Sequence, residues 1–396
     1  MPQMQWRSDD TEKWPYGFGT GVDGDLTIGS NTTEAPIDSS CSGTAAATSL
    51  SATNASFAGG QFILIHQTRG TGAGAWELNK IASYTAGTIT TQFPLKNTYT
   101  DSGASQAQVL VIKQYNNYTV SSTFTLTGKG WDGNVGGITV VMAKTAINIA
   151  GTISQKGSDG RTSSGATPIL PLDGGGYRGG GSRDSINSFG GQGEGQNGDR
   201  GTASSSANGM GGGGGGGNAT FNNGGGGGHA TAGLAGSASQ STNGAAGGTG
   251  GAANLTTMLF GGGGGGATGT AGSNTVSACN GGGIVILIAP SVTISGAINI
   301  RGGGYTVGNY PEAGGGGAGG SCLIKCITAT LGTNLIVGTG GVTTHDAPYN
   351  SGDGGNGRIH IDYSGSYTGT TNPTIDATLD GTIVPPAGGG FILMMV

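Results

Sequence analysis

The sequence is poor in charge. Only 9% of its 396 residues are charged, whereas globular domains usually carry about 25%. The 16 lysines and arginines form no run or stripe, and a phosphate-binding surface needs clustered cations. Nucleic acid is therefore not expected as a partner. Solubility must come from Ser, Thr, Asn and exposed backbone, which is common in extracellular and virion β-proteins and unusual in a cytoplasmic enzyme.

Cysteines and long apolar runs are also scarce. The four cysteines, Cys41, Cys279, Cys322 and Cys326, are too few for a disulfide scaffold in a chain of this size. Cys322 and Cys326 would lie about 13 Å apart along a straight strand, too far to bridge. We expect small buried thiols, and a Cys279–Cys322 disulfide between neighbouring strands stays open. No stretch approaches ~18 consecutive apolar residues, so we expect no membrane insertion.

The first residues, MPQMQWRSDD, contain no apolar stretch of the kind found in a secretory signal. A surface-type composition without an export signal favours a virion protein that is released by lysis. A signal trimmed from the printed sequence is the rival explanation.

Recognisable catalytic and metal-binding motifs are missing. Residues 193–198 match G-x-G-x-x-G by chance, because no helical pattern follows them. Residues 354–359 begin like a calcium-binding nonapeptide, but Ile359 stands where the ligating Asp belongs. Scattered histidines and cysteines form no zinc pattern, so we expect no metal and no cofactor. His360 and Asp362, which would share one face of a strand, are the sharpest enzymatic candidate; exposed polar residues are the alternative.

Glycine is abundant instead. The chain has 90 glycines, about three times the usual share. Between residues 174 and 283, 43 of 110 residues are glycine, with runs at 211–217, 224–228 and 261–266. A flexible linker is one interpretation. An ordered segment is favoured by the apolar strands on both sides of it and by the apolar residues 255–260, which directly precede the glycine run 261–266.

An ordered glycine segment needs a particular kind of stabilisation. Fixing a backbone costs about 1–2 kcal/mol per residue, and glycine has no side chain to bury. The compensation must come from dense main-chain hydrogen bonds between closely packed segments. Left-handed extended helices of the polyproline-II type permit such packing, since only glycine fits where backbones nearly touch.

Short β-strands are expected elsewhere. In the first part of the chain they fall at 60–66, at 81–85 and 88–91 as a hairpin, and at 108–113. All four tryptophans, Trp6, Trp14, Trp76 and Trp131, lie in this part, which indicates a compact core there.

A repeat follows the first part of the chain. A Gly pair, an apolar strand, a short turn and a second strand recur at 136–153 and 282–300, and more loosely at 319–328 and 357–363. Stacking such units makes a continuous core, as in a β-solenoid. Residues 284–288 are apolar at every position, so both faces of this strand should be covered.

Residues 18–28, FGTGVDGDLTI, resemble the opening of many phage tail and glycine-rich surface proteins. The alternation of glycine runs with variable inserts resembles the glycine-rich adhesins at the tips of T-even-type tail fibres. The resemblance covers residues 15–30 and 170–390 and is compositional more than positional. It implies a polyglycine-II sandwich with host specificity in the loops. The long N-terminal domain and the β repeats depart from that family.

The resemblance places the receptor-binding loops at 177–189, 218–223, 267–280 and 305–312. The aromatic residues that a receptor could contact there are Tyr177, Phe189, Phe221, Tyr305 and Tyr310. Wedges that space the glycine layers are the alternative role for these side chains.

We therefore predict an all-β chain, with a small N-terminal β-domain followed by a glycine-rich β-solenoid or polyglycine-II-like repeat region. The expected division is an N-terminal docking or assembly domain at 1–135, a first β-repeat at 136–170, a packed glycine-rich segment at 171–283, and C-terminal β-repeats at 284–396.

Three functional hypotheses follow. The first is a non-enzymatic phage tail-fibre adhesin, located on the virion or an extracellular surface. Its partners would be a host outer-membrane protein or polysaccharide and other virion or fibre proteins. The second is a self-assembling filament or coat subunit, a homo-oligomer in which residues 391–396 insert into a neighbour; a last buried strand is the alternative for that segment. The third is a polysaccharide-degrading β-solenoid enzyme, which would need paired acids, with His360 and Asp362 as candidates.

Overall fold

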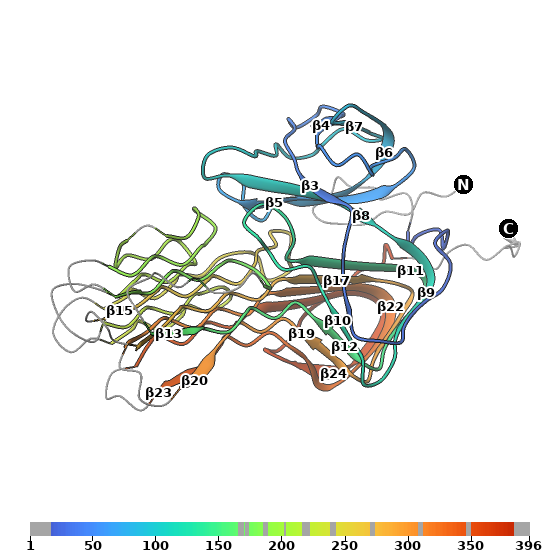
Figure 1. Ribbon diagram of the computed structural model, residues 1–396. Helices are drawn as coiled ribbons and strands as arrows, with labels where there is room; N and C mark the ends of the chain where they lie inside the picture. Colours follow the sequence, from blue (N-terminus) through green and yellow to red (C-terminus); the bar gives the residue numbers. More distant parts are fainter. Residues whose placement is uncertain are drawn as a thin grey trace, which may run out of the picture.

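The computed structural model describes residues 17–164, 170, 174–184, 189–201, 203–215, 222–237, 243–269, 274–307, 312–345 and 350–383 (Figure 1). Every regular element among these residues is a β-strand, and none is a helix. The expected all-β fold class is confirmed. None of these residues forms a helix with the length and apolar character needed to cross a bilayer.

A six-stranded antiparallel sheet, the N-terminal sheet, lies at the top of Figure 1. Its order is β3 (Asp38–Ser40), β8 (Gln106–Ile112), β5 (Phe62–Arg69), β6 (Trp76–Thr85), β7 (Thr88–Thr91) and β4 (Ser49–Ser51). The expected hairpin is present as β6 and β7. Ala86 and Gly87 both have positive φ, 43° and 87°, as tight hairpin turns require.

The second sheet, the parallel stack, contains twelve strands that all pair in parallel. Its strands are β1 (Leu26–Ile28), β2 (Thr32–Thr33), β9 (Gln114–Val120), β10 (Thr125–Thr127), β11 (Ile138–Ile149), β12 (Thr152–Ser154), β17 (Ile284–Ile288), β18 (Ser291–Ile294), β19 (Ala297–Asn299), β22 (Ser321–Val337), β24 (Arg358–Asn372) and β25 (Asp376–Leu379).

The repeat noticed in the sequence sets the register of this stack. Ile138, Ile284, Ser321 and Arg358, the first residues of four strands, lie side by side in one row. Each repeat then bends into a second strand segment that again pairs with its neighbours; Ile147, for example, pairs with Val292. Consecutive repeats therefore form successive layers of one core.

Strand β17 is buried at every residue, as its apolar sequence predicts. Ile286 belongs to the apolar cluster that contains Phe62 and Trp131, beneath the N-terminal sheet. Leu287 faces the other way and joins the interior of the stack with Ile324. Both faces are covered because the strand lies between two apolar layers.

Strands β1, β2, β9 and β10 precede residue 135 but belong to the parallel stack. The stack therefore uses residues from both sides of the boundary expected at 135. The proposed division into four domains stays a prediction.

The glycine-rich segments form a third region, the glycine lobe, which extends to the left in Figure 1. It comprises the described residues between β12 and β17, between β19 and β22, and between β22 and β24. The chain leaves the stack after the last strand of a repeat, runs through this lobe and returns to begin the next repeat.

Main-chain hydrogen bonds hold the lobe together with a period of three. In the run 261–266, the first and fourth N–H groups donate to one neighbouring segment, the second and fifth to another, and the third and sixth to a further one. The acceptors, in chain order of the donors, are the carbonyls of Gly282, Gly228, Glu194, Cys279, Gly225 and Gly191. Three residues per turn is the repeat of an extended polyproline-II helix.

At many glycines of this lobe, neighbouring backbones approach too closely for any side chain. A Cβ atom added to Gly264 would lie 2.0 Å from the carbonyl oxygen of Gly315, and one added to Gly281 would lie 1.8 Å from that of Gly261. The glycine composition therefore has a direct steric cause.

All four cysteines are buried free thiols, so the Cys279–Cys322 disulfide left open by the sequence is absent. Burial raises the pKa of both Cys279 and Cys322 to about 12. These thiols are inert packing residues at neutral pH.

Candidate functional site

Short strand pairs lie in the outer part of the glycine lobe, where Figure 1 labels β13, β15, β20 and β23. The pairs join β13 (Thr162–Ser164) and β21 (Glu312–Ala313) to β16 (Asn274–Val276), β14 (Arg183–Asp184) to β15 (Thr268–Gly269), and β20 (Tyr305–Val307) to β23 (Thr343–His345). They flank segments 165–169, 185–188, 270–273, 308–311 and 346–349, which lie outside the described residues. The bases of these segments are thus fixed by ladder hydrogen bonds.

Tyr177, one of the five aromatics expected at the receptor site, lies in the interior. It is fully buried, and its hydroxyl donates to the carbonyl of Thr68 on β5. Its ring meets the edge of Phe260 at a centroid distance of 5.4 Å. Tyr177 joins the N-terminal sheet to the glycine lobe, and its surface is not accessible to a receptor in this arrangement.

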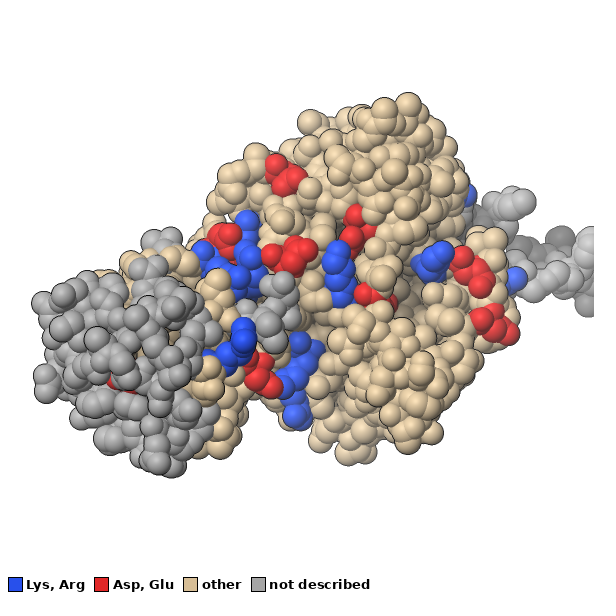
Figure 2. Space-filling model, in the orientation of Figure 1, with Lys and Arg blue, Asp and Glu red and all other residues tan. Residues whose placement is uncertain are grey.

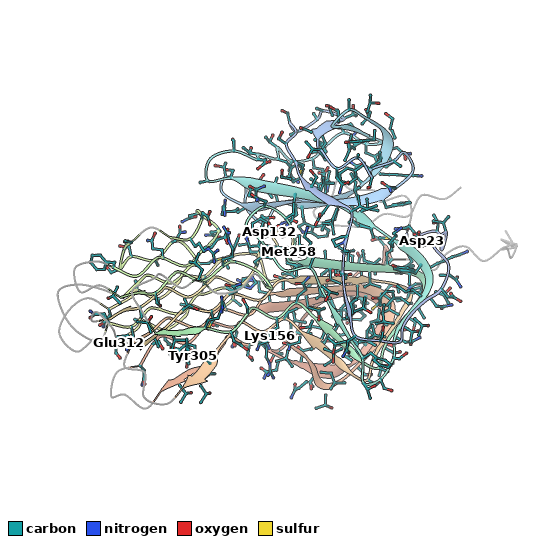
Figure 3. All side chains as sticks on the ribbon, viewed as in Figure 1. Asp23, Asp132, Lys156, Met258, Tyr305 and Glu312 are labelled. Atoms are coloured by element: carbon teal, nitrogen blue, oxygen red, sulfur yellow. The ribbon has the colours of Figure 1, made fainter. Side chains whose placement is uncertain are left out.

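Tyr305 lies in the outer part of the lobe, where Figure 3 labels it near Glu312. It is partly buried, and its hydroxyl donates to the carbonyl of Gly314 at 2.7 Å and also contacts the Ser351 hydroxyl. Burial raises the pKa of this phenol. Phe189 is also partly buried, and Phe221 and Tyr310 lie outside the described residues. A receptor role for these four residues stays a prediction.

His360, the enzymatic candidate, sits in a closed network of charges on β22, β24 and β25. Its Nδ1 lies 2.8 Å from Oδ2 of Asp376, and its Nε2 lies 2.9 Å from Oδ1 of Asp362. The other Asp362 oxygen accepts a hydrogen bond from Lys325. His360 and Asp362 do share one strand face, as the sequence predicts.

This network leaves little capacity for catalysis. His360 is 1% exposed, and each ring nitrogen faces a carboxylate, so neither is free to take a proton from a substrate. Burial tends to raise the pKa of Asp362, but the His360 hydrogen bond and the Lys325 charge outweigh it and lower that pKa. These contacts connect the side chains of β22, β24 and β25 at the edge of the sheet.

A second charged cluster, which no sequence pattern indicates, joins the glycine lobe to the N-terminal sheet. Glu194 is completely buried. One carboxylate oxygen accepts from Arg69 of β5; the other accepts from Trp131 Nε1 at 3.0 Å and from Arg178 Nε at 2.9 Å. Asp199 completes the cluster on the Arg178 side. Only tertiary structure brings these residues together, because they are far apart along the chain.

Charge on the visible face gathers across the middle of the molecule, as Figure 2 shows, while the upper part of the N-terminal sheet carries little. Both signs are present in this band. Among the described residues, Lys129 and Asp38 form one such pair at 2.8 Å. A band of mixed sign does not resemble the continuous basic surface that nucleic acid binding requires.

Sequence reasoning also missed a cavity of about 360 Å³ between the N-terminal sheet and the first strands of the parallel stack. Its lining includes Glu34, Tyr115 and Tyr118 among aliphatic side chains. The cavity has no motif, since its residues come from six strands and the segments between them.

No protein-family model matches the chain, and no curated protein matches it. Two solved structures show weak similarity. One is the Gp54 tailspike of Acinetobacter baumannii bacteriophage AP22 in complex with A. baumannii capsular saccharide, with 9% identity, a TM-score of 0.19, and coverage of 89% of this chain and 58% of that one. The other is the tailspike protein gp49 from Pseudomonas phage LKA1, with 10% identity, a TM-score of 0.18, and coverage of 88% and 65%.

This chain spans less than two thirds of the length of either tailspike. TM-scores of this size are no basis for assigning a shared fold.

Proposed function

We propose that this chain is a non-enzymatic receptor-binding protein of a phage tail, which presents the outer loops of its glycine lobe to a host cell surface. One observation carries the proposal. Extended glycine segments leave the parallel stack and return to it, and the short strand pairs in the outer part of the lobe are held by this hydrogen-bonded support. Binding loops commonly project from such rigid scaffolds.

The lobe suits this role because main-chain hydrogen bonds keep its segments in place. We infer that it is a polyglycine-II sandwich, in which segments of both directions pack side by side. The N–H groups of Gly262 and Gly265 donate to Gly228 and Gly225, so these segments run in opposite directions. Gly316 and Gly319 donate to Gly352 and Gly355, so those segments run in the same direction.

In a support of this kind, the groups that stabilise the fold are different from the groups that determine binding specificity. The hydrogen bonds between glycine segments are made mainly by main-chain groups, so loop side chains can change while the platform persists. Fixed loop bases also reduce the entropy that is lost when a ligand binds. The proposed ligand is a host surface polysaccharide or outer-membrane protein.

The N-terminal sheet is the proposed attachment to other virion or fibre proteins. The buried Glu194 cluster and Tyr177 connect this sheet firmly to the lobe. Force applied at one region would therefore be transmitted to the other.

Self-assembly is a second candidate, favoured by strand β25. All four of its residues are exposed, and Leu379 is 66% exposed. Among the described residues β25 pairs only with β24, which leaves a free parallel edge. Such an edge can template another chain. A concentration-dependent increase in mass that is lost in Leu379→Asp would support this candidate.

Loop replacement tests the receptor-binding proposal. Segments 270–273 and 308–311 are replaced by Gly-Ser sequences of equal length, and binding of labelled protein to a panel of bacterial strains is measured. We expect binding to fall at least about tenfold, which corresponds to roughly 1.4 kcal/mol, with unchanged Tm. The matched control replaces the exposed residues 44–46 of the N-terminal region. Unchanged binding after replacement of both segments would contradict the proposal.

A further inference from the structure

The cavity between the N-terminal sheet and the parallel stack has the features of a small-molecule site. Its volume of about 360 Å³ falls within the range of roughly 300–1,000 Å³ that is usual for ligand pockets. Strands β1, β8, β9 and β11 and the segment 32–37 provide the walls. Most lining side chains are aliphatic, including Leu26, Ile37, Leu110 and Ile138.

Glu34 places a carboxyl group in this apolar wall. One oxygen accepts a hydrogen bond from the Thr139 hydroxyl; the other has no hydrogen-bond partner within the described residues. Burial raises the pKa of Glu34 to about 7, against the opposing effect of the Thr139 hydrogen bond. Glu34 is partly buried, and an ionised carboxylate in this apolar wall has no counter-charge within the described residues, which is costly unless a ligand supplies one.

Two tyrosines lie beside Glu34. The Tyr115 and Tyr118 ring centroids are 5.2 Å apart, with the planes inclined at 53°. Tyr118 is 3% exposed, and neither phenol hydroxyl makes a hydrogen bond within the part of the chain that the structure describes. Burial raises the pKa of both phenols; the negative charges of Asp23 and Glu34 add to this at Tyr115, and that of Glu34 adds to it at Tyr118.

Among the residues that the structure describes, no cation pairs with Glu34. Lys113 lines the cavity, but its ammonium group is directed toward Asp23 at 3.7 Å and its side chain is 54% exposed. Lys129 pairs with Asp38 instead. Within the described residues, Glu34 therefore forms no ion pair.

We infer that this cavity binds a small organic cation with an apolar shell, of the alkylammonium class. Glu34 would supply the counter-charge, and the Tyr115 and Tyr118 rings would supply cation–π contact. The aliphatic wall would bury the alkyl groups. An anion would be repelled by Glu34, and a neutral apolar ligand would leave the carboxylate without a partner.

The charge of Glu34 gives this binding a pH dependence. The cation pairs with the ionised carboxylate, so affinity falls as the pH drops through about 7, where Glu34 takes up a proton. Tyr115 and Tyr118 stay neutral over this range because burial raises their pKa. Lys113, which lies 3.7 Å from Asp23, also lines the cavity.

Calorimetry with the full chain tests the inference, with choline and its neutral carbon analogue 3,3-dimethylbutan-1-ol as probes. At pH 8 we expect choline to bind at least about tenfold more tightly than the alcohol, given the strength of desolvated cation–π and charged contacts. Glu34→Gln should remove this preference, and Tyr118→Leu should weaken choline more than the alcohol. Asp25→Asn, which changes an exposed carboxylate outside the cavity, is the matched control.

Equal affinities for choline and the alcohol, or no choline binding at pH 8, would overturn the inference. So would a choline affinity that is the same at pH 6 and pH 8 in the unaltered protein. This last comparison needs no substitution, so it decides the matter even where Glu34→Gln lowers the stability of the fold.

Discussion

The parallel stack and the glycine lobe keep extended segments ordered by opposite kinds of packing. Both align extended segments by main-chain hydrogen bonds. In the stack, alternate side chains fill a continuous interior that includes Val285, Leu287 and Ile324. In the lobe, neighbouring backbones occupy the space that side chains would need, as between Gly264 and Gly315. A region can therefore be ordered because side chains fill its interior, or because its backbones pack so closely that no room for side chains is left.

The two regions should differ in what they tolerate. A buried aliphatic side chain stabilises the stack by about 1.5–3 kcal/mol. A main-chain hydrogen bond contributes only about 0.5–1.5 kcal/mol net, but every residue of the run 261–266 donates one to a neighbouring segment. Truncating a buried side chain should therefore destabilise the stack, whereas adding a side chain to a packed glycine should destabilise the lobe.

The largest effect is expected from adding a side chain inside the lobe. In Gly264→Val, the Cβ atom would lie 2.0 Å from the carbonyl oxygen and 2.4 Å from the carbonyl carbon of Gly315, and neither backbone atom can move aside. We expect a loss above about 4 kcal/mol in the free energy of unfolding. Urea denaturation measures it.

Gly29→Ala is the control, because nothing lies within 4 Å of the added Cβ atom. It should change stability by less than about 0.5 kcal/mol. Two similar curves for the Gly264 and Gly29 variants would refute the close packing of the lobe.

Removing a side chain should have the next largest effect, and only in the stack. Leu287 is fully buried between layers, so Leu287→Ala should cost about 3 kcal/mol through lost burial and a residual cavity. Leu234 lies in the lobe and is 60% exposed, with its N–H bonded to the carbonyl of Asp353. Leu234→Ala should stay within about 0.5 kcal/mol. Thermal unfolding of both variants measures the contrast, and a large loss in Leu234→Ala would mean that side chains also support the lobe.

Patterns that repeat along the chain could be predicted from the sequence. Residues 284–288 are apolar at every position, which predicts coverage on both faces, and the structure confirms it. The repeated phrase predicts that Ile138 and Ile284 belong to equivalent strands, although the long glycine-rich segment separates them. Such features depend on local composition and on similarity between segments of the chain, and both can be recognised in the amino-acid sequence.

Sites assembled from unrelated segments could not be predicted. Glu34 and Tyr118 line the same cavity although they are far apart in the sequence, and no motif marks either residue. Glu194 stood within a chance motif, yet it binds Arg69 across the junction of two regions. Tyr177 shows a further difficulty: an aromatic residue among glycines suits an exposed loop or a buried joint equally well, and only its tertiary neighbours distinguish the two.

Lowering the pH should have the smallest of the three effects on stability. It extends the comparison to the lobe's own chemistry, because the lobe buries a titratable group among its backbones. His229 is fully buried there, its Nδ1 lies 2.8 Å from the carbonyl oxygen of Gly319, and burial lowers its pKa to about 4. The unfolded chain takes up a proton near pH 6.5 and the folded lobe does not, so stability is lost as the pH falls below about 6.5. Between pH 7 and 5.5 this amounts to about 1 kcal/mol. His66 of the N-terminal sheet has a pKa lowered to about 4 by burial and adds a loss of the same sign. His229→Asn should therefore remove only part of the pH dependence, as measured by urea denaturation at both pH values. An unchanged slope in this variant would mean that His229 is protonated in the folded lobe, and that the packing around it is open to water.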